Sequence, residues 1–362
     1  MLKPRKLTRQ VRIGPLTLGG DAPVRLQSMT TTATADVEAT VKQIHELEEA
    51  GCELVRVAVP REEDARSLSA IVKRIRIPLV ADIHFNYRLA LIALDQGIAK
   101  LRLNPGNIGS EDRIRQVVEK AKAQRIPIRI GVNGGSLEKD ILKKHGHPTP
   151  AALIESAQRH IKILEDLEFY DIVVSLKASD PITTIQAYRL MSERTRYPLH
   201  LGVTESGTLI RGTVASTLAL GTLLMEGIGD TIRISLTAES VEEIKVGRFL
   251  LENLGLRQPM AKVVSCPSCG RAEVDVFKLA EDVERRALSI KAPMTISVLG
   301  CAVNGPGEAG EADFGITGGK EKGVIYINGK TAKTVPEADL AGELFSAIDA
   351  EKEERTPGKN TP

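Results

Sequence analysis

Short apolar runs rich in Val, Ile and Leu alternate with amphipathic helical stretches between residues 24 and 250. The runs predict eight strands, at residues 24–30, 53–59, 78–84, 100–105, 127–133, 171–179, 198–206 and 230–236. A helical pattern follows each strand, and Asp180-Pro181 begins one of these helices as N-cap and first helical residue. Strict alternation of strand and helix predicts a parallel sheet, and eight such units fit a closed TIM (β/α)8 barrel better than an open sheet.

The pattern changes after residue 256. We predict a barrel domain over residues 1–256, a small α+β domain over residues 257–350 and a polar, frayed tail over residues 351–362. The small domain begins with a short linker at residues 257–262. Within it the sequence predicts a helix at residues 274–289 and two apolar strands at residues 295–300 and 323–329, with a glycine-rich loop between the strands.

Composition narrows the choice of function. Hydrophobic residues make up 42% of the chain and charged residues 27%, and 49 basic residues against 47 acidic ones give a net charge of +2. This near balance, with 3% aromatic residues and no Trp, disfavours nucleic-acid and membrane binding. The basic N-terminus has no apolar segment behind it, and four cysteines do not form a disulfide framework. We therefore expect a cytoplasmic protein with reduced thiols.

Four predicted strands carry an arginine between two aliphatic residues: Arg56, Arg102, Arg129 and Arg233. Alternation along a strand sends the aliphatic neighbours under the helices and each arginine into the barrel interior. Lys177 ends the sixth strand in the same way. Further polar residues gather near the C-terminal strand ends, where TIM barrels have their active sites, namely Asp82, His84, Asn104, Asn133, Thr204, Glu205 and Ser235.

These residues could pair with one another as buried salt bridges, but their charges do not balance. Five cations face two carboxylates, Asp82 and Glu205, which leaves an excess of three. Each uncompensated buried ion costs several kcal/mol. A ligand with about three negative charges removes that cost, and arginine forks match phosphate oxygens. The pattern predicts a small anionic substrate such as a diphosphate, with His84 beside Asp82 as an acid–base or hydroxyl-binding group.

The cysteines indicate a second centre. Cys266 and Cys269 form a C-x-x-C motif in SCPSCGR, and Cys301 opens the loop GCAVNGPGEAG. Cys52 stands where a helix turns into the second barrel strand and is expected to be a small buried hydrophobic residue. A [4Fe–4S] cluster on three cysteines leaves one iron for an oxygen ligand, for which Glu308 is the candidate. Zinc with three cysteines and one carboxylate stays open, although zinc sites usually have four N or S ligands and this domain has no histidine.

The motifs SCPSCGR and GCAVNGPGEA together resemble the signature of the (E)-4-hydroxy-3-methylbut-2-enyl diphosphate synthase family. The segments QSMTTT, VADIHF, LRLNPGNIG, RIGVNGGSL, VVSLKASD, HLGVTE and RISLT resemble the same family in the same order, over residues 5–350. The chain is similar to the short bacterial two-domain form, without the additional central domain of other members.

This resemblance implies a TIM barrel joined to a [4Fe–4S] domain, acting in non-mevalonate isoprenoid biosynthesis. It implies reductive opening of 2-C-methyl-D-erythritol 2,4-cyclodiphosphate with two electrons from reduced flavodoxin or ferredoxin and loss of water. The implied cluster ligands are Cys266, Cys269, Cys301 and Glu308. The implied catalytic residues are Glu308, His84, Asp82 and Glu205. The implied substrate-binding residues are Arg56, Arg102, Asn104, Arg129, Asn133, Lys177, Thr204, Arg233 and Ser235.

The predicted barrel also bears on assembly. Its eighth helix runs antiparallel to the strands and ends at the face opposite the mouth. The barrel is about 30 Å deep if a 20-residue helix sets the scale, whereas six linker residues span at most about 20 Å. We therefore expect a head-to-tail homodimer in which each cluster domain covers the partner's barrel, as the resembled family implies.

Two other readings compete with this one. The first is a transferase on a dihydropteroate-synthase-like barrel with a structural zinc site. The second is a non-enzymatic zinc-ribbon adaptor. The inward cations on five strands argue against it, because an adaptor does not require them.

Overall fold

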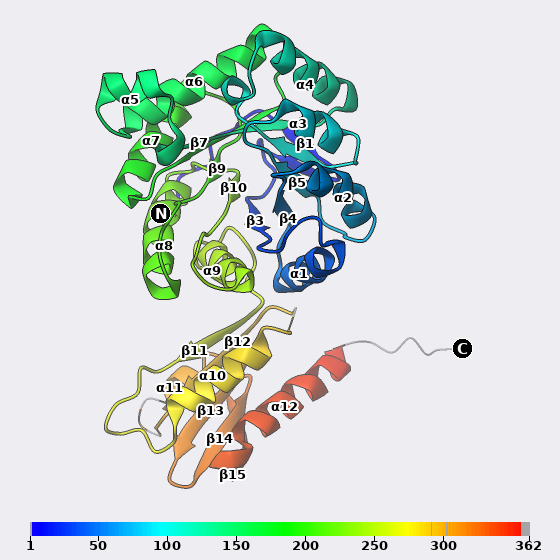
Figure 1. The fold of residues 1–362 in the computed structure, drawn as a ribbon. Coiled ribbons are helices and arrows are strands. Elements are labelled where there is room, and N and C mark those ends of the chain that lie inside the picture. Colours follow the sequence, from blue (N-terminus) through cyan, green and yellow to red (C-terminus); the bar gives the residue numbers. More distant parts are fainter. Residues whose placement is uncertain (1, 291, 302, 304, 356–362) are drawn as a thin grey trace. The chain divides into compact units, whose positions relative to one another are not determined.

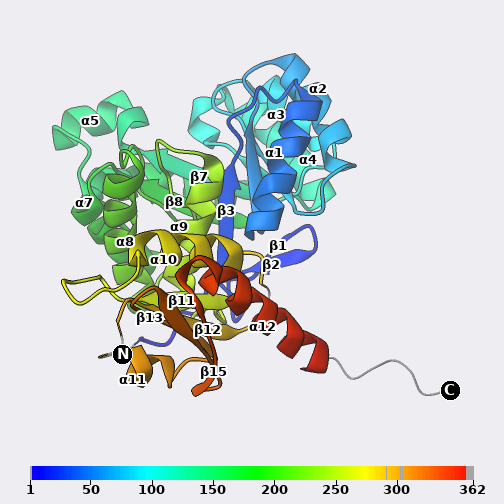
Figure 2. The same cartoon turned by 90° about the horizontal axis from the view of Figure 1, so that it is seen from below.

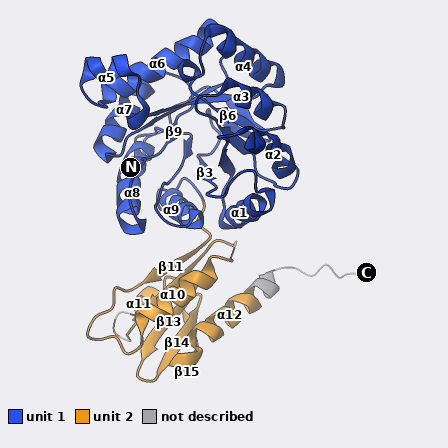
Figure 3. Ribbon diagram, in the orientation of Figure 1, with its two compact units in different colours: residues 1–257 blue, residues 258–362 orange. Residues whose placement is uncertain are grey.

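The computed structural model describes the whole chain except residues 1, 291, 302, 304 and 356–362. The chain divides into two compact units, Met1–Arg257 and Gln258–Pro362, and each is described by itself (Figure 3). Among the described residues, no helix has both the length and the apolar character that crossing a membrane requires.

Unit 1 is a parallel eight-stranded barrel with its strands in the interior (Figure 1). The strands are β3 (Arg25–Met29), β4 (Leu54–Ala58), β5 (Leu79–Asp82), β6 (Lys100–Arg102), β7 (Ile128–Asn133), β8 (Ile172–Lys177), β9 (His200–Leu201) and β10 (Thr231–Ile232). Each pairs with its neighbour in sequence from β3 to β8, and β10 joins β9 to β3. The TIM barrel predicted from the strand–helix alternation is confirmed.

The ring closes differently between β8 and β9, where the contact is a single bridge from Val174 to Leu199. A side chain completes this seam. The amide of Leu176 in β8 donates to the hydroxyl of Tyr188 at 3.0 Å, and that hydroxyl donates to the carbonyl of His200 in β9 at 2.5 Å. Tyr188 is fully buried, so one phenol from the helix layer replaces a ladder hydrogen bond that the short strand β9 does not supply.

Helices surround the strands on the outside (Figure 2). They are α1 (Val37–Ala50), α2 (Glu62–Val72), α3 (Tyr87–Leu94), α4 (Glu111–Gln124), α6 (Pro150–Asp166), α7 (Pro181–Arg194), α8 (Leu209–Met225) and α9 (Ser240–Asn253). Asp180 caps α7 as predicted, since its carboxylate accepts from the amide of Thr183, and Pro181 is the first helical residue. Three short elements lie in the loops after β6 and β7, namely η1 (Pro105–Asn107), η2 (Gly134–Ser136) and α5 (Lys139–His145).

The core of unit 1 lies between the strands and these helices. All eight aliphatic residues that flank the four strand arginines are buried in it: Val55, Val57, Leu101, Leu103, Ile128, Ile130, Ile232 and Ile234. The predicted alternation is therefore observed, and it directs the arginines toward the barrel axis.

A hairpin that the sequence analysis did not predict precedes the barrel. Its strands β1 (Val11–Ile13) and β2 (Leu16–Leu18) pair antiparallel. Its apolar side chains pack on Leu54 and Val173, at the beginnings of β4 and β8. The hairpin thus closes the N-terminal end of the barrel, which leaves the C-terminal end as the mouth.

Unit 2 is a five-stranded sheet with helices. Its strands are β11 (Ala261–Ser265), β12 (Met294–Leu299), β13 (Phe314–Gly319), β14 (Lys322–Ile327) and β15 (Lys330–Pro336), in that spatial order. The first three are parallel and the last two add antiparallel. The helical elements are α10 (Val276–Ala287), α11 (Gly305–Ala309), η3 (Glu337–Asp339) and α12 (Leu340–Arg355).

Two boundaries in unit 2 differ from the prediction. Residues 261–262, expected in the linker, begin β11 because Ala261 and Lys262 pair with Met294 and Thr295. Residues 351–355, expected in the frayed tail, continue α12, since Glu, Lys and Arg favour helix. The remaining tail, residues 356–362, lies outside the described residues.

Candidate active site

A polar hollow of about 130 Å³ occupies the barrel mouth. It is lined by Arg56, Asp82, His84, Arg102, Arg129, Gly131, Asn133, Ser175, Lys177, Thr204, Arg233 and Ser235. Asp82, Arg102, Asn133 and Lys177 are each the last residue of their strand. Parallel strands end at one face of a barrel, and this register brings together ten of the twelve barrel residues predicted for the site.

Asp82 is the charged centre of this hollow. Its carboxylate accepts from Nη1 of Arg102 at 3.0 Å and lies 3.5 Å from Nε of Arg56. Burial acts to raise the pKa of Asp82, but the two guanidinium groups outweigh it and hold the pKa well below its usual range. Nη1 of Arg102 also lies 2.7 Å from Nε2 of His84. Burial, with Arg102 beside it, lowers the pKa of His84, so the ring is neutral at neutral pH.

Asn104, a predicted substrate-binding residue, lies one layer behind the hollow. Its side-chain oxygen accepts from the amide of Gly131 at 2.8 Å, and its side-chain nitrogen donates to the Gly131 carbonyl at 3.0 Å. The same carbonyl accepts from Nη2 of Arg102 at 2.7 Å. Asn104 therefore holds the strand against which Arg102 lies. Only glycine fits at this place, because a Cβ on Gly131 would meet Nε of Arg102 at 2.5 Å.

Two lining cations form no ion pair with a carboxylate among the described residues. Nε and Nη1 of Arg129 are buried, and neither finds a hydrogen-bond partner among the described residues. Lys177 is 5% exposed, and burial lowers its pKa well below the ordinary range. Sequence reasoning missed a further cation, Lys100, which is fully buried with Nζ 3.4 Å from Oε1 of Gln27. The alternation in Lys100-Leu101-Arg102 could have found it, since residues two apart share a strand face.

The second carboxylate that faces the cations is Glu243, not Glu205. Glu205 is exposed in the loop after β9, at a φ of +54°, and does not line the hollow. The expectation that it points inward was wrong because β9 ends at Leu201, so the alternation does not extend to residue 205. Glu243 reaches inward from α9 and lies 3.3 Å from Nη2 of Arg233.

The corrected count is six inward cations, including Lys100, against two carboxylates. The excess is four rather than three if both lysines are charged. A buried lysine can relieve part of this excess by losing its proton, whereas arginine keeps its charge. The hollow is therefore suited to an anion with several charges.

Unit 2 contains a second hollow, of about 310 Å³, lined by Cys266, Cys269, Cys301, Glu308 and Arg271 among others. Cys266 and Cys269 lie in the loop after β11, Cys301 follows β12, and Glu308 lies in α11. All three thiols are free, and Sγ of Cys266 accepts from the amide of Gly300 at 3.3 Å. Hydrogen bonds from Arg271 lower the pKa of Cys269, which favours the thiolate that binds metal.

The structure brings the four predicted metal ligands to one hollow and leaves Cys52 out of it. Within the described ranges, no three His, Cys, Asp or Glu side chains stand close enough together to be ligands of one ion. Cys52 is buried in unit 1, where its thiol donates to the carbonyl of Leu54 at 2.9 Å. Burial raises the pKa of Cys52 to about 12, which suits the expected structural role.

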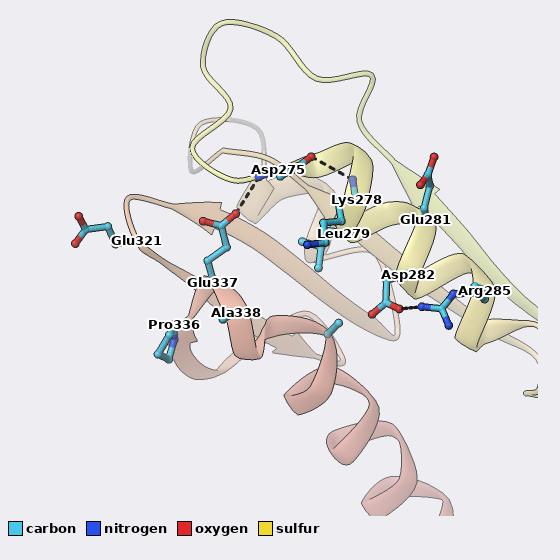
Figure 4. A pocket seen from close by; sticks show the side chains of 11 residues that line it. Asp275, Lys278, Leu279, Glu281, Asp282, Arg285, Glu321, Pro336, Glu337 and Ala338 are labelled. Carbon is cyan, nitrogen blue, oxygen red and sulfur yellow. Dashed lines mark hydrogen bonds and ion pairs between the residues drawn. The ribbon is translucent and has the colours of Figure 1, made fainter.

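Another hollow in unit 2, of about 850 Å³, contains none of the predicted residues (Figure 4). It lies beside α10 and the start of α12 and is rich in carboxylates. These are partly engaged locally: Glu337 accepts from the amide of Asp275 at 2.9 Å, and Asp282 pairs with Arg285 (Figure 4). Nothing in it matches the chemistry of the barrel mouth.

A TIM barrel with a cation-lined mouth, followed by a unit with a thiol-lined hollow, is the architecture of a two-unit enzyme suited to a small anionic substrate. Comparison with known proteins gives the family. The model described as GcpE TIM-barrel domain matches residues 8–248, and that described as GcpE protein C-terminal domain matches residues 262–350.

Two curated relatives carry the same name, 4-hydroxy-3-methylbut-2-en-1-yl diphosphate synthase (flavodoxin). The one from Listeria monocytogenes serotype 4b is 57% identical over 97% of this chain and 95% of its own. The one from Caldanaerobacter subterraneus is 56% identical over 96% of this chain and 98% of its own. The chain belongs to the GcpE family of 4-hydroxy-3-methylbut-2-en-1-yl diphosphate synthases. It is an oxidoreductase of isoprenoid biosynthesis.

Among solved structures, the Plasmodium falciparum HPPK-DHPS with STZ-DHP matches with a TM-score of 0.51 at 11% identity, over 70% of this chain and 51% of that chain. This likeness shows the barrel fold alone. The alternative of a dihydropteroate-synthase-like transferase is not favoured, because the family models and the curated relatives belong to the synthase.

Proposed function

We propose that the barrel mouth binds 2-C-methyl-D-erythritol 2,4-cyclodiphosphate through its two phosphates and holds it for reduction. The activity of the family is the reductive opening of this ring. Two electrons and two protons enter, the ring carbon–oxygen bond to phosphate and the neighbouring carbon–hydroxyl bond break, and a carbon–carbon double bond forms between the two carbons. The products are (E)-4-hydroxy-3-methylbut-2-enyl diphosphate and water.

The observation that carries the proposal is the unbalanced charge of the mouth. Arg129 is 1% exposed, and two of its nitrogens, Nε and Nη1, have no hydrogen-bond partner among the described residues. A buried guanidinium in this state costs several kcal/mol unless a ligand completes it. The diphosphate supplies oxygen acceptors to Arg129 and negative charge to Lys177. Arg56 in β4, Arg102 in β6 and Arg233 just after β10 surround the same volume.

Asp82 and His84 would contact a hydroxyl group of the bound substrate. Asp82 stays ionised because two arginines hold its pKa low, and it fixes the guanidinium of Arg102 against His84. The neutral ring of His84 has one donor and one acceptor nitrogen, so it can bind a hydroxyl or move a proton at that position. The resemblance also implies a catalytic role for Glu205, which lies in the exposed loop after β9 and outside the hollow, so that role stays a prediction.

Cys266, Cys269, Cys301 and Glu308 would hold a [4Fe–4S] cluster, which supplies electrons one at a time from reduced flavodoxin or ferredoxin. The donor types fit, because three free thiols and one carboxylate line one hollow. Each would bind a different iron of the cluster, so no three of them have to meet at a single ion. Arg271 favours the thiolate form of Cys269. Glu308 would hold the remaining iron through its carboxylate oxygen.

The two halves of the site lie in different compact units. We propose that they meet in a head-to-tail homodimer in the cytoplasm, with the thiol-lined hollow of one copy facing the barrel mouth of the other. Each copy then contributes residues to both active sites.

Anaerobic purification with iron and sulfide analysis tests the cluster. We expect a brown protein with about four iron and four sulfide ions per chain. Replacing any one of Cys266, Cys269 and Cys301 by serine should remove the visible absorbance and the activity, whereas the Cys52→Ala control should keep both. A colourless protein that binds zinc, or loss of the absorbance with Cys52→Ala alone, would refute the assignment.

A further inference from the structure

Glu243 is a carboxylate buried at the wall of the barrel. It is the fourth residue of α9 and is 4% exposed. Its side chain reaches between strands rather than toward solvent. Oε2 accepts from the hydroxyl of Ser28 in β3 at 2.9 Å, and Oε1 accepts from the amide of Leu236 after β10 at 3.0 Å.

The same carboxylate lies along one edge of the Arg233 guanidinium. Nε of Arg233 is 3.4 Å from Oε2, and Nη2 is 3.3 Å from Oε1. This two-point contact fixes the plane and the rotation of the guanidinium. The remaining nitrogen, Nη1, lies 3.8 Å from the sulfur of Met29. Arg233 lines the mouth hollow, so the edge that Glu243 leaves free is the edge available to a ligand.

We propose that Glu243 is a positioning residue that presents Nη1 of Arg233 to a phosphate of the bound diphosphate. This inference rests on the proposed function, because it assigns a role within the same substrate site. Without the carboxylate, Arg233 has four other interior cations as neighbours in the mouth, Arg56, Arg102, Arg129 and Lys177, and repulsion favours turning its guanidinium away. Glu243 also reduces the charge excess on this side of the mouth, as Asp82 does on the other.

A purely structural role predicts something different. Glu243 ties α9 to β3 and to the loop after β10 through Ser28 and Leu236, and a neutral glutamine oxygen could accept one of those bonds. A structural tie would lower thermal stability when changed, whether or not Arg233 is present. A positioning role makes the effect on substrate affinity depend on Arg233.

The test is a double-mutant cycle on the cluster-loaded full chain. Calorimetry measures Kd for 2-C-methyl-D-erythritol 2,4-cyclodiphosphate with Glu243→Gln, Arg233→Met and both together. Because hydrogen bonds to charged groups contribute about 1.5–3 kcal/mol, we expect Glu243→Gln to weaken binding about 10- to 100-fold. In the Arg233→Met background the same change should have less than about a twofold effect.

The matched control is Glu242→Gln. Glu242 precedes Glu243 on the same helix and pairs with Lys245 at 2.6 Å, so its replacement should leave Kd unchanged. Ser28→Ala removes a bond to Glu243 without touching Arg233 and should lower the thermal midpoint more than the affinity. Glu243→Asp, which keeps the charge, should bind more tightly than Glu243→Gln and serves if the glutamine variant does not fold.

The outcomes separate the two claims. Equal losses of affinity from Glu243→Gln with and without Arg233, or unchanged Kd, overturn the positioning role. Failure of the unaltered protein to bind the cyclic diphosphate overturns the proposed function instead.

Discussion

Replacing Gly131 by alanine places a methyl group against the guanidinium of Arg102. The added Cβ would lie 2.5 Å from Nε and 2.9 Å from Nη2, well inside van der Waals contact. Arg102 cannot simply swing aside, because its Nη1 donates to Asp82 and its Nη2 to the Gly131 carbonyl. Overpacking of this kind costs about 1–3 kcal/mol, and hydrogen bonds to charged groups contribute about 1.5–3 kcal/mol each.

We therefore expect Gly131→Ala to weaken binding of the cyclic diphosphate about 10- to 100-fold. The thermal midpoint should fall by about 5 °C. Calorimetry with the substrate measures the first quantity, and the visible absorbance checks that the cluster is retained. Gly135→Ala is the control, because a Cβ there meets nothing within 4 Å. If Gly131→Ala binds substrate as well as Gly135→Ala, the account of Arg102 as a held phosphate ligand is wrong.

Three further outcomes are expected. Mixing the Arg129→Ala variant with the Cys301→Ser variant should recover part of the activity, because one of the two active sites in each heterodimer is intact. No recovery from demonstrably mixed dimers would mean that each chain works alone. Burial lowers the pKa of Lys177 and a bound diphosphate raises it again, so substrate binding should take up protons and weaken as pH rises. Calorimetry at about pH 8 in two buffers with different ionisation enthalpies should therefore give two different heats of binding. Lys177→Met should reduce the difference between them. The pKa of Asp82 is lowered, so its contribution to stability is present above its ordinary pKa and disappears only in strong acid. In the Asp82→Asn variant the thermal unfolding midpoint should therefore change less with pH in the acid range.

The barrel was predictable because its evidence repeats along the chain. Eight apolar runs, each followed by a helical pattern, leave little choice of topology, and the flanking of Arg56 or Arg129 by buried aliphatic residues fixes which way the arginine points. The N-terminal hairpin was missed because its strands have three residues each, too few for a period to be read. In unit 2 no periodic pattern predicted β15, because it is exposed at six of seven positions and lacks an apolar face.

The candidate site was predictable only as far as strand alternation extends. Glu205 was expected to point inward on a strand that in fact ends at Leu201. Glu243 was missed because it lies on a helix whose outer face also carries carboxylates, such as Glu242, and periodicity does not say which of them passes between two strands. Asn104 was found, but its position behind Gly131 depends on a contact between neighbouring strands that one sequence does not encode locally.

Closure of the ring by Tyr188 has a consequence for motion in the barrel. Elsewhere neighbouring strands pair over two or more residues. Between β8 and β9 the backbone supplies one bridge and the bond from the Thr204 amide to the Ala178 carbonyl, and the phenol of Tyr188 connects the strands between these two points. Local opening should therefore be easiest at this seam, and deuterium should enter the Leu176 amide sooner than the amides inside β7. Lys177 ends β8, and Thr204 follows β9, so the two sides of the seam both reach the mouth. A diphosphate bound across them would slow that exchange, and Tyr188→Phe would speed it.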